Sequence, residues 1–323
     1  MKSLPIPSRA YGKLAVVAAI TVVVFYAIVK QFDAGALPSL FRQANLFWIV
    51  LGTLFGFVTS PFLNAARWYA ILSGGSHSVK FKKVLAITVA NWPFMVIPGR
   101  VGDLLKSYPL RHEIPVSHSI VSIIIEKIID VLALLGIIAL GALFLGKTAI
   151  LIISSGLFLA GIVAVFFANL ISRRFLAKIV PEGKTRDALT HFDHFLNSLI
   201  RRPAYFSLAI LSSVGNWLTN VFAVWCFYNA FSLTVPFTAI LTYLPISIFI
   251  GLLPVTVAGM GTRDAALIQF FANYAGSAQS LGVGILYSLS AYWLPVVAGL
   301  FFIYTTGLSS SFWPQSIDSQ KTS

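Results

Sequence analysis

Residues 96–107 of the chain read VIPGRVGDLLKS, and they interrupt a sequence that is otherwise dominated by Leu, Ile, Val, Ala and Phe. Pro98, Gly99 and Gly102 disfavour a continuous helix, because proline lacks a backbone N–H and glycine loses much conformational entropy on ordering. Arg100 and Asp103 bring charge to the same place. Such a stretch is typical of a helix that is broken inside an apolar environment and carries polar groups at the break.

The composition around this stretch is that of an integral membrane protein. Of the 323 residues, 58% are hydrophobic and only 10% are charged, whereas a soluble domain carries about 25% charged residues. Six apolar stretches are long enough to cross a hydrocarbon core of roughly 30 Å. We therefore expect membrane-spanning helices at 13–30, 46–73, 117–145, 149–171, 204–231 and 281–307.

Two further apolar stretches, which begin at Val84 and Phe237, are interrupted by proline. Pro93 and Pro98 stop the first, and the second contains Pro245 and Pro254. Each is predicted to form a half-helix, a glycine-rich break and a second half-helix, and to re-enter the membrane from one side. The predicted break residues are Pro98, Gly99 and Gly102 in the first stretch and Pro254, Gly259 and Gly261 in the second.

The distribution of positive charge predicts the orientation of these helices. With both broken stretches taken as re-entrant, 17 of the 23 Lys and Arg residues fall on one side of the membrane and three on the other. The remaining three, Arg100, Lys127 and Arg263, lie at membrane depth. The positive-inside rule then places both termini in the cytoplasm. The net charge of +13 follows from this bias and needs no nucleic-acid partner to explain it.

The order of elements also predicts an inverted repeat. The chain is expected to form one membrane domain over residues 1–323, with halves at 13–145 and 149–307 and a short cytoplasmic tail at 308–323. Each half reads as two helices, a broken segment and a helix, and the second half begins on the opposite side of the membrane. Paired broken segments of this kind indicate the substrate site of a transporter. The fold class is therefore an all-α polytopic membrane protein with six spanning helices and two re-entrant segments.

Charged residues at membrane depth are the candidate binding residues, because each is costly there unless it is paired or lines a cavity. Glu126 and Asp130 are four residues apart and share one helical face, while Lys127 is rotated by about 100°. Arg100 and Arg263 are expected to neutralise these two carboxylates. The freed N–H groups of a half-helix would add an anion site. The predicted substrate-binding residues are Arg67, Asn91, Arg100, Asp103, Glu126, Lys127, Asp130, Arg263 and Asp264.

Three stretches together resemble the motifs of the lysylphosphatidylglycerol synthase transmembrane-region family, also described as flippase-like or YbhN-like. They are NWPFMVIPGRVGDLLKSYPL at 91–110, IIIEKIIDVLALL at 123–135 and LLPVTVAGMGTRDAAL at 252–267. Arg67 and Trp68 are similar to the family's Arg-Trp pair at the cytoplasmic end of the second helix. The resemblance spans about Trp48 to Tyr304.

The resemblance implies a lipid translocase domain, which in two-domain members moves a lipid made by a fused aminoacyl-transferase domain. This chain departs from the family pattern by Asp103 and Asp264, where Glu is common, and by Lys127, where Arg is common. We expect no fused synthase domain, so a lysyl-lipid substrate has no support. The expected cargo is an anionic-headed lipid of phospholipid or polyprenyl-phosphate type in a bacterial inner membrane.

Other functions remain open at this point. An ion-coupled transporter of a small soluble solute would share the inverted repeat. A membrane-embedded lipid-modifying enzyme, or a scaffold for a glycosyltransferase or another lipid-synthesis partner, would also fit the composition. We predict no enzyme activity, no catalytic residue, no cofactor and no metal site. In the predicted cytoplasmic loop His191 and His194 read as one solvated helix face, and third and fourth metal ligands are missing.

Overall fold

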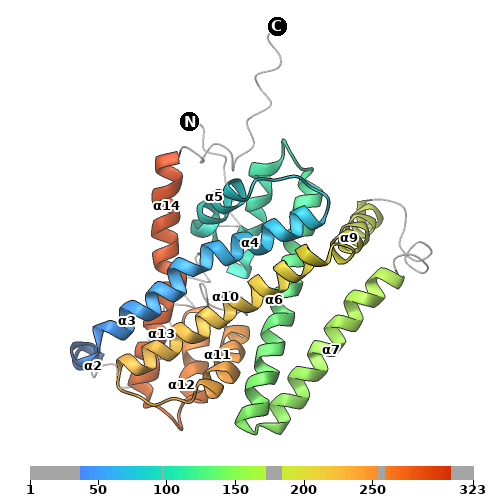
Figure 1. Ribbon diagram of the computed structural model, residues 1–323. Coiled ribbons are helices and arrows are strands. Elements are labelled where there is room, and N and C mark those ends of the chain that lie inside the picture. Colours follow the sequence, from blue (N-terminus) through green and yellow to red (C-terminus); the bar gives the residue numbers. More distant parts are fainter. Residues whose placement is uncertain (1–36, 97, 172–183, 253–258, 307–323) are drawn as a thin grey trace, which may run out of the picture.

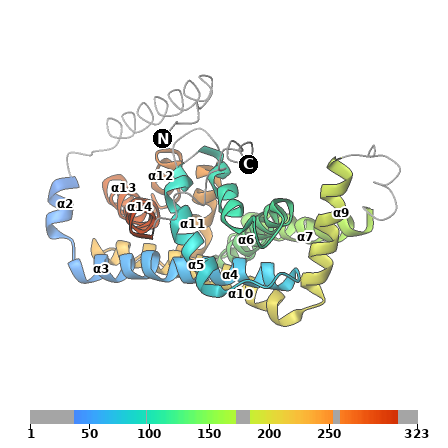
Figure 2. The ribbon, with the colours of Figure 1, turned by 90° about the horizontal axis from the view of Figure 1, so that it is seen from above.

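The computed structural model describes residues 37–96, 98–171, 184–252 and 259–306 (Figure 1). The predicted first helix at 13–30, the tail at 308–323 and Pro254 lie outside these residues. Within the described ranges all regular elements are helices. Seen from above, the short helix α2 (Leu37–Gln43) and the helix α9 (Lys184–Ile200) lie at opposite edges of the molecule (Figure 2).

Five helices in the described residues are long and apolar enough to cross a membrane, and they match five of the six predicted spans. Three of them are regular: α6 (Val116–Leu145), α7 (Thr148–Ile171) and α10 (Pro203–Ala230). The α6 helix ends at Gly146 in the left-handed region, and α7 begins two residues later. So short a connection makes α6 and α7 neighbouring helices.

The other two spans each contain one turn of π-helix. In Leu46–Gly74, the turn η2 (Leu54–Val58) separates α3 (Leu46–Thr53) from α4 (Thr59–Gly74). In Ser277–Thr306, η7 (Leu289–Trp293) separates α13 (Ser277–Ser288) from α14 (Leu294–Thr306). The turns η2 and η7 contact one another. Single π-turns inside α-helices are frequently found at functional sites.

The first broken segment begins with a half-helix, as predicted, but continues differently. Helix α5 (Phe81–Asn91) is followed by the 3₁₀ turns η3 (Trp92–Val96) and η4 (Pro98–Leu110). A second helical segment does begin beside Gly99, at Pro98, but it is 3₁₀ rather than α-helical. Proline rings at Pro93, Pro98 and Pro109 oppose regular α-helix here. A Cβ at Gly102 would overlap the carbonyl oxygen of Phe94, so the two turns pack together only with glycine at this position.

The second broken segment comprises α11 (Phe237–Gly251) and α12 (Thr262–Phe270). Helix α12 begins after Gly261, as predicted, and Gly259 and Gly261 both have positive φ, which favours glycine. Asp264 Oδ2 accepts a hydrogen bond of 3.1 Å from the Gly261 N–H and caps the helix. The expected break at Pro245 is wrong, because α11 continues through it. Membrane helices tolerate such a proline.

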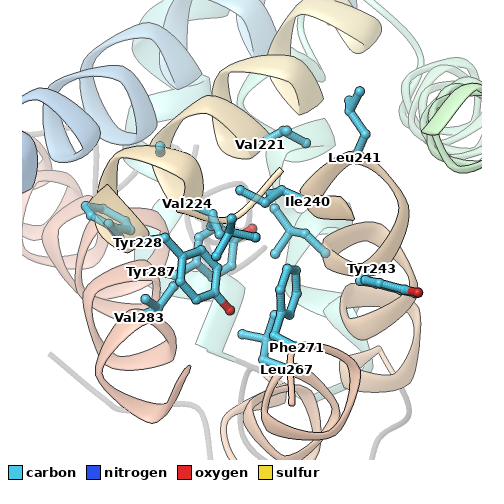
Figure 3. Close-up of a cluster of buried hydrophobic side chains, with 14 of the residues drawn as sticks. Val221, Val224, Tyr228, Ile240, Leu241, Tyr243, Leu267, Phe271, Val283 and Tyr287 are labelled. Atoms are coloured by element: carbon cyan, nitrogen blue, oxygen red, sulfur yellow. The ribbon is translucent and has the colours of Figure 1, made fainter. Parts of the chain in front are cut away.

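The largest buried cluster joins the two broken-segment helices of the second half to their neighbours. Figure 3 shows Val221, Val224 and Tyr228 of α10 meeting side chains of α11, α12 and α13. This cluster fixes α11 and α12 against α10. Helix α10 also lies alongside α3 and α4, while α6 packs between α7 and α11 (Figure 1). The inverted relation of the two halves stays a prediction.

Candidate functional site

A polar cavity of about 90 Å³ lies among α4, α5, α6, α10, η4 and the π-turns. Its lining contains six charged side chains and several amides, all from segments that are otherwise apolar. Charged groups are expensive at membrane depth unless paired. The charged lining residues are Arg67, Asp103, Lys106, Glu126, Lys127 and Asp130, and the amides are Asn64, Asn91, Asn216 and Asn220.

Arg67 of α4 is the centre of the charged network. Its Nη2 lies 2.7 Å from Glu126 Oε1, and its Nη1 donates to Asp130 Oδ1. Lys106 of η4 forms a second ion pair with Glu126. Arg67 is 1% exposed, Glu126 2% and Lys106 6%. The predicted common face of Glu126 and Asp130 is confirmed, because one guanidinium bridges both carboxylates.

Neutral donors complete the environment of Asp130. Its Oδ1 accepts hydrogen bonds from Ser213 Oγ at 2.6 Å and from Trp217 Nε1 at 3.2 Å, both on α10. Asn64 bridges α4 to α10, since its Oδ1 accepts from Arg67 Nη2 at 2.6 Å and its Nδ2 donates to Asn216 Oδ1 at 3.1 Å. These bonds hold three helices around the cavity.

Lys127 and Asp103 form a separate ion pair, with Lys127 Nζ 2.5 Å from Asp103 Oδ2. The Lys127 side chain is 35% exposed, whereas the Asp103 side chain is 9% exposed. With this pair the cavity lining holds three cations and three carboxylates, so its formal charges balance. An incoming anion therefore has to compete with carboxylates that already occupy the cations.

A second hollow adjoins the polar cavity. It is a groove of about 1370 Å³ whose walls are mainly apolar side chains of α6, α7 and α11. Several of these side chains, including Ile124, Ile153 and Leu157, are exposed on the outside of the molecule. Four residues line both spaces: Asp103, Lys127, Asp130 and Trp217. The cavity and the groove therefore lie on opposite sides of a wall that these four residues form.

The structure separates Arg263 and Asp264 from the cavity. Arg263 Nη2 lies 2.6 Å from both Asp264 Oδ1 and Ser288 Oγ. The guanidinium packs against the rings of Tyr287 at 4.8 Å and Tyr292 at 5.6 Å, and these two rings line the cavity. The expectation that Arg263 neutralises Glu126 or Asp130 is wrong, since Asp264 is its partner.

The counter-charges are instead Arg67 and Lys106, which are two of the 17 cations that the sequence places on the cytoplasmic side. Arg67 and Lys106 stand near the ends of their segments in sequence, yet both are buried in the cavity lining. The 3₁₀ turns of η4 return Lys106 toward α6. The side chain of Arg100 lies outside the described residues, so its predicted role stays a prediction.

A group of histidines lies apart from the cavity, where the loop after α4 meets the first turn of α6 and the middle of α9. His118 Nδ1 is 3.3 Å from His77 Nε2, and the His118 ring centroid is 4.8 Å from that of His191. Burial, and then the neighbouring His118, hold the pKa of His77 below its usual value. His191 and His194 are exposed on α9, as the sequence indicated. Among the described residues no three His, Cys, Asp or Glu side chains are arranged to hold a metal ion.

Comparisons with known proteins agree with this architecture. Residues 13–299 match the family model described as the lysylphosphatidylglycerol synthase TM region. The chain is similar to the UPF0104 membrane protein MJ1595 of Methanocaldococcus jannaschii, with 21% identity over 300 residues, which covers 84% of this chain and 89% of that protein. It is an integral membrane protein, and it belongs to the lysylphosphatidylglycerol synthase transmembrane-region family.

Proposed function

We propose that this protein moves an anionic-headed lipid, of phospholipid or polyprenyl-phosphate type, between the leaflets of its membrane. The observation that carries the proposal is the wall shared by the polar cavity and the apolar groove. A lipid needs two adjoining environments, one for a charged head group and one for its hydrocarbon chains. A soluble solute has no use for a groove whose exposed walls are Ile, Leu and Val.

The charges in the cavity support an exchange mechanism. Arg67 and Lys106 are neutralised by Glu126 and Asp130. A lipid phosphate would replace one carboxylate at Arg67, whose planar fork suits a phosphate as well as a carboxylate. Glu126 would keep Lys106 as its partner when a phosphate takes its place at Arg67, so the exchange would leave no buried carboxylate without a cation. Such a site binds the head group and also releases it.

The orientation expected from the charge bias places both termini in the cytoplasm, and the expected membrane is a bacterial inner membrane. In this arrangement the protein would act beside a lipid-synthesis enzyme or a glycosyltransferase that supplies or uses the lipid on one leaflet.

The test is leaflet exchange of fluorescent phospholipid and polyprenyl-phosphate analogues in proteoliposomes, read as the fraction protected from dithionite. We expect exchange with the wild-type protein and a loss of about tenfold in Arg67→Lys, which keeps the charge but loses the bidentate fork. The control is Arg42→Gln on the exposed side of α2, which should exchange lipid like the wild type. Exchange no faster than in protein-free liposomes, across the lipid panel, would contradict the proposal.

A further inference from the structure

The wall between cavity and groove has two unequal parts. Asp130 and Trp217 form one part, and Asp130 is held by Arg67, Ser213 and Trp217 together. A carboxylate with three buried donors is firmly fixed. Lys127 and Asp103 form the other part, which joins α6 to η4 through an ion pair.

Lys127 differs from the other cations of the cavity in its exposure. Its side chain is 35% exposed, against 2% for Arg67 and 8% for Lys106. On α6 it is rotated by about 100° from Glu126, so it lies beside the groove-lining Ile124 and Val131, which are three and four residues away on the same face. A lysine has a flexible apolar stem that packs on hydrocarbon and a compact ammonium that moves easily between partners.

We propose that the Lys127–Asp103 pair is the portal through which a lipid head group passes from the apolar groove into the polar cavity. The inference rests on the proposed function and adds an entry point and an order of events. Lys127 contacts the lipid phosphate first, and the phosphate replaces Asp103 as the partner of its ammonium group. The head group then moves to Arg67 and Lys106, while the acyl chains stay in the groove between α6, α7 and α11.

Physical chemistry favours this order over direct entry to Arg67. In the Lys127–Asp103 pair the lysine is partly exposed, so solvent screens its end of the attraction and its long side chain keeps some freedom, while the Asp103 carboxylate is buried. A buried, hydrogen-bonded pair such as Arg67–Glu126 resists separation, because breaking it leaves a buried charge without a partner. Among the cations of the cavity lining, an incoming phosphate therefore reaches the partly exposed Lys127 before it reaches Arg67 or Lys106.

Accessibility from the bilayer tests the placement of Lys127 without any transport measurement. Single cysteines are introduced as Lys127→Cys, Lys106→Cys and Phe301→Cys in a Cys226→Ala background, and proteoliposomes are treated with a maleimide carried on an acyl chain. Lys127→Cys should react at a rate within about threefold of the exposed Phe301→Cys position and at least about tenfold faster than Lys106→Cys, because Lys106 is buried behind the wall. Equal, slow reaction at positions 127 and 106 would overturn the portal.

Leaflet exchange tests the role of the charge. The swapped variant Lys127→Asp/Asp103→Lys keeps an ion pair across the wall but presents a carboxylate to the groove, so exchange of anionic lipids should fall by at least about tenfold. Lys127→Arg keeps a cation at the portal and should retain exchange. Wild-type exchange rates in the swapped variant would overturn the portal alone. If the wild-type protein exchanges no lipid, the proposed function fails, and the portal fails with it.

Discussion

Among single residues, Arg67 is central to the cavity because its guanidinium forms ion pairs with two carboxylates of α6. Glu126 in turn forms ion pairs with both Arg67 and Lys106. Each of these three groups is nearly or completely removed from solvent. Removing one member of a buried ion cluster leaves the remaining charges without a partner in an apolar environment. The resulting loss of stability is larger than the net stabilisation that the intact ion pair contributed.

We therefore predict that Glu126→Ala lowers the free energy of unfolding by about 3–5 kcal/mol, because Arg67 and Lys106 lose their shared partner. Thermal unfolding of the detergent-solubilised protein measures the change. Glu113→Gln is the matched control, since Glu113 pairs with Lys83 where both side chains are more than 40% exposed. That variant should change the stability by less than about 1 kcal/mol. Similar losses in both variants would show that burial does not govern these pairs.

The residue pairing could be predicted only in part from the sequence. The helical period places Glu126 and Asp130 on one face of α6, and the structure confirms it. The identity of their partners depends on how α4 and η4 pack against α6, and no local pattern reports that packing. The resemblance to a family motif brings Arg67 into the predicted binding residues, whereas nothing in the sequence points to Lys106.

At the scale of elements, α6 is the helix that connects both hollows. Glu126 and Asp130 face the cavity, Lys127 lines the wall, and the more C-terminal part of the helix packs against α11. Gly141 permits that packing, since a Cβ there would lie 2.6 Å from Thr242 Oγ1 and 2.8 Å from the Thr242 nitrogen. Small residues at such crossings let membrane helices approach closely.

Gly141→Ala should accordingly move α6 away from α11 and destabilise the protein by about 1–3 kcal/mol. Gly136→Ala on the same helix is the control, because a Cβ there would meet only Phe158 at 3.7 Å, an ordinary contact. Midpoints of thermal unfolding should fall for position 141 and stay equal or rise for position 136. The opposite order would contradict the close contact between α6 and α11.

Element boundaries were predictable wherever a long apolar run stands between charged or turn-forming residues. The five described spans begin and end within a few residues of their predicted bounds. The effect of proline was harder to predict from the sequence. Pro245 does not interrupt α11, whereas the proline-containing region after Asn91 forms 3₁₀ turns in place of α-helix. The π-turns η2 and η7 leave no sequence signal, since they are single insertions in otherwise helical runs.

At the scale of the whole molecule, the charge bias predicts the topology. Lys82 at the start of α5 belongs to the side with 17 cations, and Lys147 between α6 and α7 belongs to the side with three. Cysteines introduced at these positions in a Cys226→Ala background should react differently with an impermeant maleimide added to intact cells. Lys147→Cys should be labelled from outside and Lys82→Cys only after lysis. Strong external labelling at position 82 would reverse the topology.

The molecule as a whole joins a charged cavity to an apolar groove, and under the proposed function one lipid occupies both. A phospholipid with a photoreactive group on an acyl chain tests this directly, with adducts mapped by mass spectrometry. Adducts on Ile153 and Leu157 of the groove should exceed those on the outward-facing Phe301 and Tyr304 of α14. This excess should disappear in Lys106→Gln, which changes only the buried head-group site, and persist in Lys83→Gln, which changes an exposed pair. An equal distribution of adducts in the wild type and in both variants would contradict the binding of one lipid across the cavity and the groove.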